Sequence, residues 1–229
     1  MDYHFSNGDR TYRKLATPAF NSALSPEMVG ETTLDLISFI QQNLNRPIDV
    51  FEIMQRTKIE VLGKLAFGYK FDRNEIKKNP LKGHDLLTSH DTTSMSLNVS
   101  LYYLAKYPEM QEKAREEVIS VLGNYPNTIP NSDQLKKIKG TSQDWKTYFA
   151  NKHHSHNIPF AWIPFSAGPR NCMGQKFSLM EQLVIISMLL LKYNWTLPNN
   201  IINKDKLLLA PRFLLRPVDL KLIFTERIN

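Results

Sequence analysis

The stretch Pro164–Phe177, PFSAGPRNCMGQKF, contains the only cysteine of this 229-residue chain. Cys172 stands between a loop broken by glycine and proline and a long apolar segment, which we expect to be a helix from about Gln175 to Tyr193. A thiol at the start of a helix faces the free amide groups of the first turn, which stabilise the thiolate form that ligates metals. The alternative is a small buried hydrophobic residue, the usual role of a single cysteine.

The neighbours of Cys172 indicate what its thiolate would bind. Gly168 and Gly174 let the backbone approach a flat ligand closely or adopt a positive φ. Arg170 offers a charged fork of donors that suits a carboxylate, and Phe165 supplies an apolar wall beside the sulfur. Iron on the sulfur and a propionate on the arginine together predict a haem site, in the pattern F-x-x-G-x-R-x-C-x-G.

Composition and charge are those of a globular protein and exclude several other classes. Hydrophobic residues make up 42% of the chain and aromatic residues 10%, which is too much for a disordered protein. A single cysteine excludes an intramolecular disulfide and a cysteine-rich zinc site. The net charge of +7 suits acidic partners, but the basic residues are scattered and match no RNA-binding or helix-turn-helix signature. We therefore expect no nucleic acid partner.

The sequence shows no sign of insertion into a membrane. Its first ten residues, MDYHFSNGDR, are polar, so we expect no signal peptide and no membrane anchor. The most apolar run extends from Leu183 to Leu191 and is interrupted by Ser187. A membrane span needs about 20 residues, so this run predicts a buried helix.

The remaining patterns predict a mainly α chain with a small β hairpin. Helices are expected to begin at Ser25, Asp49, Thr92, Pro108 and Gln175. Asp49 and Glu52 have the spacing of a capping box, and Gly123 is expected to end the helix that starts at Pro108. Residues 124–163 show no convincing periodicity. Two short apolar runs around Pro217–Asp219 predict the hairpin.

The Cys172 stretch resembles the cysteine-ligand loop of the cytochrome P-450 monooxygenases, and Ala161–Pro164 in front of it is similar to the family too. Further blocks agree with this resemblance. RKLATPAF at 13–20 resembles the helix that passes one haem edge, and LAFGYKFD at 65–72 resembles the helical region that follows. Residues 90–118 resemble the second half of the oxygen-binding helix and the helix after it. The resemblance implies a single, incomplete cytochrome P-450-like domain over residues 1–229.

The resemblance also implies a cofactor, a reaction and roles for further residues. Arg13 matches the family's propionate-binding arginine, and Asp91 with Thr92 matches the acid–alcohol pair that manages protons for oxygen activation. The implied activity is a haem-thiolate monooxygenase with iron on Cys172, which inserts one atom of O2 into a small apolar substrate and takes electrons from a reductase. The alternatives are a surface arginine and ordinary polar helix residues. Family members are typically at the endoplasmic reticulum membrane; without an anchor, we expect this chain in the cytoplasm.

The family blocks are joined more tightly here than in the family. The seams lie near residues 72–84, 88–89 and 137–162. The missing parts match the helices over the substrate pocket, the first half of the oxygen-binding helix, and the helix with the Glu-x-x-Arg motif. Glu112–Arg115 has the letters of that motif but follows the oxygen-binding helix, so we interpret it as a solvated charge pair. Two alternatives therefore remain: a non-catalytic remnant with weak or no haem binding, and a small helical interaction protein.

Overall fold

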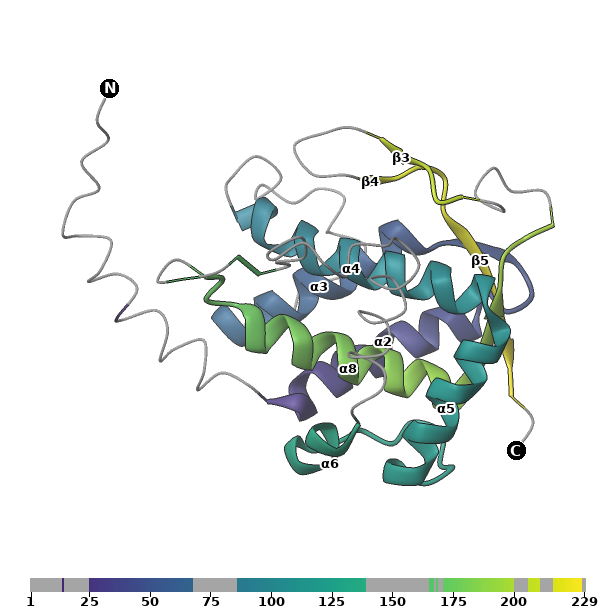
Figure 1. Ribbon diagram of the computed structural model, residues 1–229, viewed down its shortest axis with the longest axis horizontal. Helices are drawn as coiled ribbons and strands as arrows, with labels where there is room; N and C mark the ends of the chain where they lie inside the picture. The colour runs from purple at the N-terminus through teal and green to yellow at the C-terminus, as the bar shows by residue number, and fades with distance from the viewer. Residues whose placement is uncertain are drawn as a thin grey trace, which may run out of the picture.

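The structure, a computed structural model, describes Lys14 and residues 25–67, 86–138, 165, 166, 168, 171–199, 206–210 and 216–227, without the side chains of 65–67 and 86–91. The helices of this part are α2 (Pro26–Gln41), α3 (Val50–Phe67), α4 (Leu86–Lys106), α5 (Pro108–Leu122), α6 (Ser132–Lys137) and α8 (Gln175–Lys192). The strands are β1 (Pro47–Asp49), β2 (Tyr193–Thr196), β3 (Leu209–Ala210), β4 (Arg216–Pro217) and β5 (Lys221–Glu226). The mainly α prediction is confirmed (Figure 1).

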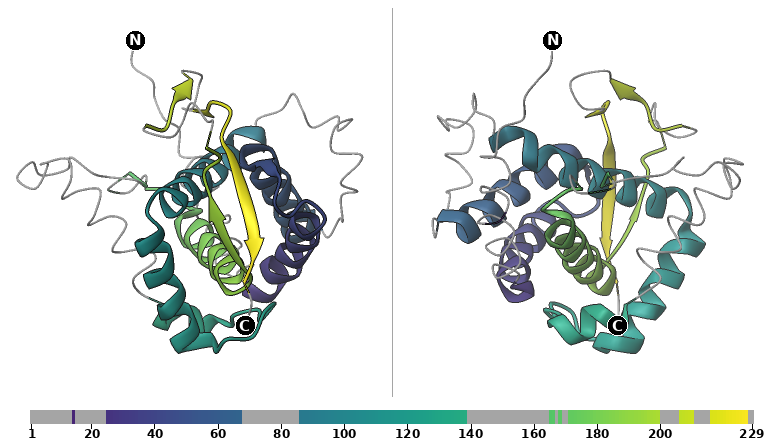
Figure 2. Two further views of the ribbon diagram at one scale, coloured as in Figure 1. Left: turned by 90° about the vertical axis from the view of Figure 1, so that its right-hand side faces the viewer. Right: turned by 60° about the vertical axis from the view of Figure 1, so that its left-hand side comes forward.

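Helix α8 is the central element of the helical layer. It packs against α2, α4 and α5, and its arrangement beside α2 and α5 is visible from two sides (Figures 1 and 2). Val184, Ile185, Met188 and Leu189 in this helix are completely buried. A helix that is apolar nearly all round belongs in a core, so the buried helix predicted from this run is confirmed. In the part of the chain described by the structure, no helix is long and apolar enough to cross a membrane.

The predicted helix starts depend on local capping signals and are largely correct. The Ser25 hydroxyl accepts a hydrogen bond from the Met28 amide at 3.3 Å, directly before α2. The Asp49 carboxylate accepts one from the Glu52 amide at 3.1 Å. The Glu52 carboxylate binds Arg56 instead of closing the box, because the two are one helical turn apart.

Helix α4 begins earlier than predicted, at Leu86 and not at Thr92. The helix runs without interruption through residues 88–89, and the seam expected there stays a prediction. The seams at 72–84 and, beyond residue 138, at 137–162 lie outside the described residues. The single domain over 1–229 stays a prediction.

Helix α6 lies within a region for which no periodicity was found. The Asn131 side chain accepts hydrogen bonds from the Asp133 and Gln134 amides at 3.1 and 2.9 Å, and the Gln134 side chain accepts one from the Asn131 amide at 3.0 Å. This is a complete capping box. The helix is too short to show an apolar period, so the signal lay in its cap and not in its pattern.

The tail pairs differently from the predicted hairpin. Strand β5 is antiparallel to β1 on one edge and to β2 on the other, with Ile48 opposite Leu222 and Trp195 opposite Phe224. Strand β4 pairs with β3 instead, in a second, two-stranded sheet. Strand β1 pairs with Lys221–Ile223 and β2 with Ile223–Glu226, and a bend at Asp219 with φ 48° lies between β4 and β5. Pairing across Pro217–Asp219 was therefore wrong.

Tyr193 links the first residue of β2 to α2. Its buried hydroxyl donates toward the Ile37 carbonyl at 3.0 Å and the Gln41 side-chain oxygen at 2.9 Å. Burial, and to a smaller extent the charge of Glu226, raises the pKa of this hydroxyl above its ordinary value of 10.0. A raised folded-state pKa contributes stability below the unfolded pKa, and that stability is lost as the pH rises beyond it.

We therefore expect the free energy of unfolding to fall as the pH rises above about 10, and to fall less steeply in Tyr193→Phe. At neutral pH the same variant should lose about 1 kcal/mol, the usual contribution of one hydrogen bond. Urea denaturation at a series of pH values measures both effects. Tyr125, which is 72% exposed, provides the control Tyr125→Phe. Equal slopes for wild type and Tyr193→Phe would contradict the prediction.

Candidate functional site

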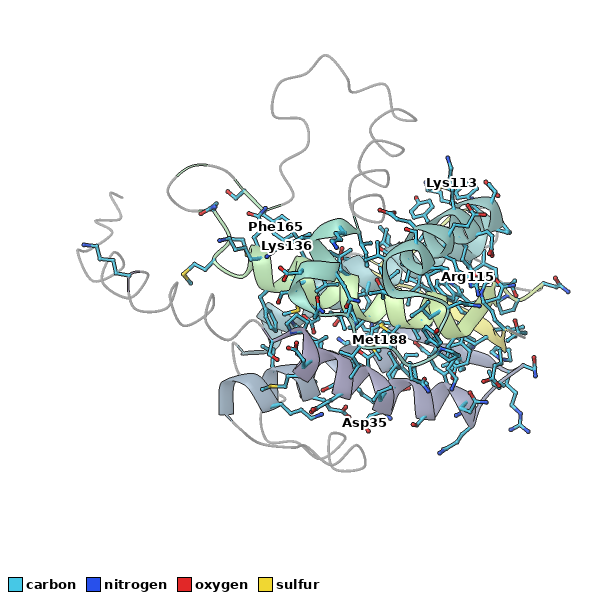
Figure 3. All side chains as sticks on the ribbon, turned by 90° about the horizontal axis from the view of Figure 1, so that it is seen from below. Asp35, Lys113, Arg115, Lys136, Phe165 and Met188 are labelled. Atoms are coloured by element: carbon cyan, nitrogen blue, oxygen red, sulfur yellow. The ribbon has the colours of Figure 1, made fainter. Side chains whose placement is uncertain are left out.

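Cys172 lies at the surface, just before α8 begins. Its backbone amide donates a hydrogen bond to the Phe165 carbonyl at 2.9 Å, and the Asn171 amide donates one to the Gly168 carbonyl at 3.2 Å. These bonds close the loop between Phe165 and Cys172, and Phe165 lies beside the start of α8 (Figure 3). The loop therefore presents an accessible thiol, and the alternative of a small buried hydrophobic residue is wrong.

The two glycines near the thiol serve different geometric purposes. Gly168 has a φ of 77°, in the left-handed region that favours glycine. Gly174 has an ordinary φ of −84°, and a Cβ there would lie 3.9 Å from the Cys172 sulfur, a normal contact distance. A Cβ at position 174 would therefore clash with no described protein atom. Because glycine has no side chain, however, one flank of the Cys172 sulfur stays uncovered. A flat ligand on the thiol needs such a flank.

The donor set around Cys172 suits a cofactor that brings most of its own ligands. Helix α8 starts without a side-chain cap, and the positive end of its dipole adjoins the cysteine. Among the described residues, no three His, Cys, Asp or Glu side chains cluster as a metal site. A haem iron needs only one axial protein ligand of this kind, whereas a structural zinc ion needs four ligands. The exposed thiol of Cys172 is a donor of the kind that haem iron takes from a protein.

Arg13 and Arg170 lie outside the described residues, so their propionate-binding roles stay predictions. Asp91 is in the described backbone of α4 but its side chain is not, and Thr92 is exposed. The next residue, Thr93, is buried and donates a hydrogen bond to the Ser178 hydroxyl of α8 at 3.0 Å. The fold thus brings the segment after Asp91 and Thr92 against the first turns of α8, the helix that follows Cys172. The proton-relay role stays a prediction.

Lys58 and Glu181 form a buried ion pair that the sequence interpretation missed. The Lys58 ammonium on α3 binds the Glu181 carboxylate on α8, and the two side chains are 3% and 0% exposed. The same ammonium lies 4.3 Å from the ring centroid of Phe177, one helical turn before Glu181. Burial raises the pKa of the Glu181 carboxyl, and the charge of Lys58 opposes that rise.

A signal for this pair was present in the sequence. Lys58 shares helical spacing with Met54 and Val61, which are buried core residues. Glu181 likewise shares helical spacing with buried apolar residues of α8, Phe177 and Val184. One lone basic and one lone acidic residue on two apolar faces predict a buried pair, but only if the two helices are known to touch.

The Glu112–Arg115 string lies on α5, as predicted. The Arg115 guanidinium is 3.5 Å from the carboxylate of Glu112, which is 46% exposed. The Arg115 side chain is only 14% exposed, so the pair exists but is solvated on the Glu112 side alone. The Glu112 carboxylate also binds the guanidinium of Arg227, just after β5, at 2.8 Å. This second partner is distant in sequence, so the spacing of residues on α5 could not predict it.

The sequence profile of the cytochrome P-450 family matches residues 84–142 and 147–224, more than half of the chain. The chain belongs to the cytochrome P-450 family. Haem is the cofactor of this family, and a thiolate-ligated haem agrees with the donor set around Cys172. Family members generally use O2, a redox partner and apolar substrates.

Individual relatives agree with this membership. The cytochrome P-450 chain is 31% identical over a 166-residue alignment to a cytokinin hydroxylase of Arabidopsis thaliana; the match covers 48% of this chain and 32% of the relative. It is 28% identical over a 189-residue alignment to cytochrome P-450 4c3 of Drosophila melanogaster, and this match covers 58% of this chain and 35% of the relative. The chain thus spans about a third of these relatives. A crystal structure of a cytochrome P-450 superposes with a TM-score of 0.79 at 15% identity, over 99% of this chain and 83% of the other.

Proposed function

We propose that this cytochrome P-450 chain holds haem iron on the Cys172 thiolate and acts as a monooxygenase. The reaction inserts one atom of O2 into a small apolar substrate, with two electrons from a reductase. One observation carries the proposal: an exposed thiol at the uncapped start of α8, on a loop closed by backbone hydrogen bonds. When bound, haem supplies the oxygen-activating chemistry, which thiolate ligation favours.

The chain's own residues have distinct parts in this proposal. The bond from the Cys172 amide to Phe165 holds the backbone that carries the thiol, and the dipole of α8 stabilises the thiolate. Arg170 and Arg13 bind the propionates through their guanidinium donors. Gly168 and Gly174 leave the ring room to approach. On α4, Asp91 and Thr92 hold and pass on protons.

The class of substrate is inferred from relatives, and the charge of the electron donor is inferred from the residues near Cys172. A human relative, 30% identical over 164 residues, is named an ultra-long-chain fatty acid omega-hydroxylase. That name and the apolar substrates of the family support hydroxylation of an apolar chain or ring. Lys176, exposed in the first turn of α8, adds positive charge next to Cys172. A basic surface there suits an acidic electron donor.

The absorption spectrum of the reduced, CO-treated protein tests haem binding by Cys172. The purified protein is mixed with haem, and we expect a Soret band at the position typical of thiolate ligation. Cys172→Ala should abolish this band because it removes the ligand. Asn171→Ala, at the exposed neighbouring position, is the control and should retain it. Folded wild-type protein that takes up no haem would refute the proposal and favour the non-catalytic remnant.

A further inference from the structure

The Lys58–Glu181 pair joins α3 to the part of α8 that follows the cysteine. Glu181 lies within the first two turns of α8, and Phe177 lies one turn closer to Cys172 on the same face. The single ammonium of Lys58 contacts both, through an ion pair and through the face of the ring. One α3 side chain therefore fixes two successive turns of the helix that begins at the cysteine loop.

Helix α4 holds the same two turns from another side. Thr93 bonds Ser178 at 3.0 Å, and the Ser96 hydroxyl donates to the Gln182 side-chain oxygen at 2.6 Å. The second half of α8 is different, because apolar residues dominate its contacts from Val184 onward. Polar, directional contacts are thus concentrated at the cysteine end of α8.

A buried ion pair is a poor choice for stability alone. Removing two charges from water costs several kcal/mol per ion, and an apolar pair of similar volume is often as stable or more so. One Glu181 carboxylate oxygen also has no hydrogen-bond partner among the described residues, which adds to the cost. What a charged pair does supply is directionality, since charge-assisted hydrogen bonds have a preferred geometry and apolar contacts do not.

We propose that Lys58 and Glu181 are positioning residues: their ion pair fixes the first two turns of α8 against α3 and thereby sets the position of the Cys172 thiolate. This inference rests on the proposed function, in which that thiolate binds haem iron. Neither residue touches the cofactor in this account. They act through the backbone of α8, from Phe177 to Gly174 and on to the cysteine loop.

Amide hydrogen exchange in the haem-free protein provides the first test. In Lys58→Met the methionine keeps the apolar stem, and Glu181 can take up a proton and stay buried, so we expect this variant to fold. Removing one partner of a buried pair is strongly destabilising, so exchange at the Phe177–Gln182 amides should accelerate about tenfold or more. Exchange at Val184–Leu191 should change less than threefold. Glu181→Gln should show the same pattern and carries the test if Lys58→Met does not fold.

Leu222→Ala is the control for stability, because Leu222 is fully buried in β5, where it lies opposite Ile48 of β1. It should lower the melting temperature without a selective rise in exchange at Phe177–Gln182. Glu52→Gln, which breaks an exposed ion pair on the same helix α3, is the control for charge and should change neither. Uniform acceleration along α8 in Lys58→Met, or none, would overturn the inference.

The second test uses the haem-loaded protein. Lys58→Met should shift part of the CO-complex Soret absorbance from the thiolate position to that of neutral-thiol ligation, whereas Leu222→Ala should not. An unchanged ratio of the two bands would overturn the positioning role. The two proposals can fail separately: a wild type that takes up no haem refutes the proposed function, and the exchange pattern then decides alone whether the pair positions the cysteine end of α8.

Discussion

Trp195→Ala is expected to lower the free energy of unfolding by about 3–5 kcal/mol, the usual cost of removing a large aromatic side chain from a core. Trp195 on β2 is only 1% exposed. Its indole N–H donates to the Leu101 carbonyl of α4 at 3.0 Å, and its ring lies 5.8 Å from that of Phe224 on β5. The side chain thus joins the sheet to the helices, and its loss leaves a cavity and removes a hydrogen bond between β2 and α4.

Urea denaturation followed by far-ultraviolet circular dichroism measures this effect. Because domains are typically stable by only about 5–15 kcal/mol, we expect the variant to be partly unfolded even without denaturant. Trp195→Phe separates the two contributions, since it keeps most of the ring and loses the hydrogen bond, and it should cost about 1–3 kcal/mol. A loss below about 1 kcal/mol in Trp195→Ala would show that the site collapses around the missing ring.

Gln111→Ala should have the second largest effect, a loss of about 3 kcal/mol, although it removes only a polar side chain. The buried amide of Gln111 on α5 donates to the carbonyl oxygens of Leu104 and Trp195, each at 3.0 Å, and accepts from the Trp195 amide at 3.2 Å. Alanine would leave these three backbone groups without their partner in a buried place. Each unsatisfied group costs about 1–3 kcal/mol.

The same denaturation experiment checks the Gln111 prediction. Gln111→Leu, which fills the space but restores no hydrogen bond, should be destabilised to a similar extent, because the polar backbone groups and not the volume dominate the cost. Gln42→Ala changes an exposed glutamine at the end of α2 and should stay within about 0.5 kcal/mol of wild type. If Gln111→Leu were as stable as wild type, the hydrogen bonds of Gln111 would not be what stabilises this junction.

Several features were predictable because their causes lie within a few residues of each other. Ser25 and Asp49 cap helices that start where their side chains predict, and Gly123 ends α5 with a φ of 77°. The loop around Cys172 was predictable for the same reason, since glycine, arginine and cysteine at fixed spacing describe one local geometry. Its resemblance to the cytochrome P-450 family was then confirmed by the family profile.

Other local signals were present but too weak or too easily misplaced. The cap at Asn131 was visible without an apolar period to support it, so α6 was missed. The start of α4 was set six residues late, at Thr92, because the turn before it carries polar residues that apolar spacing does not detect. In both cases hydrogen bonding of the backbone, and not hydrophobic pattern, extends the helix.

By itself, the sequence determined the helical class, the cysteine loop and the chemistry that loop suits, because each depends on neighbours along the chain. Only the tertiary structure decided which distant segments meet. Strand β5 takes β1 and β2 as its two neighbours, Gln111 reaches the backbone of Trp195, and Lys58 meets Glu181 across 123 positions. These partners are selected by burial, since a polar group removed from water must find a partner wherever the packed helices bring one within reach.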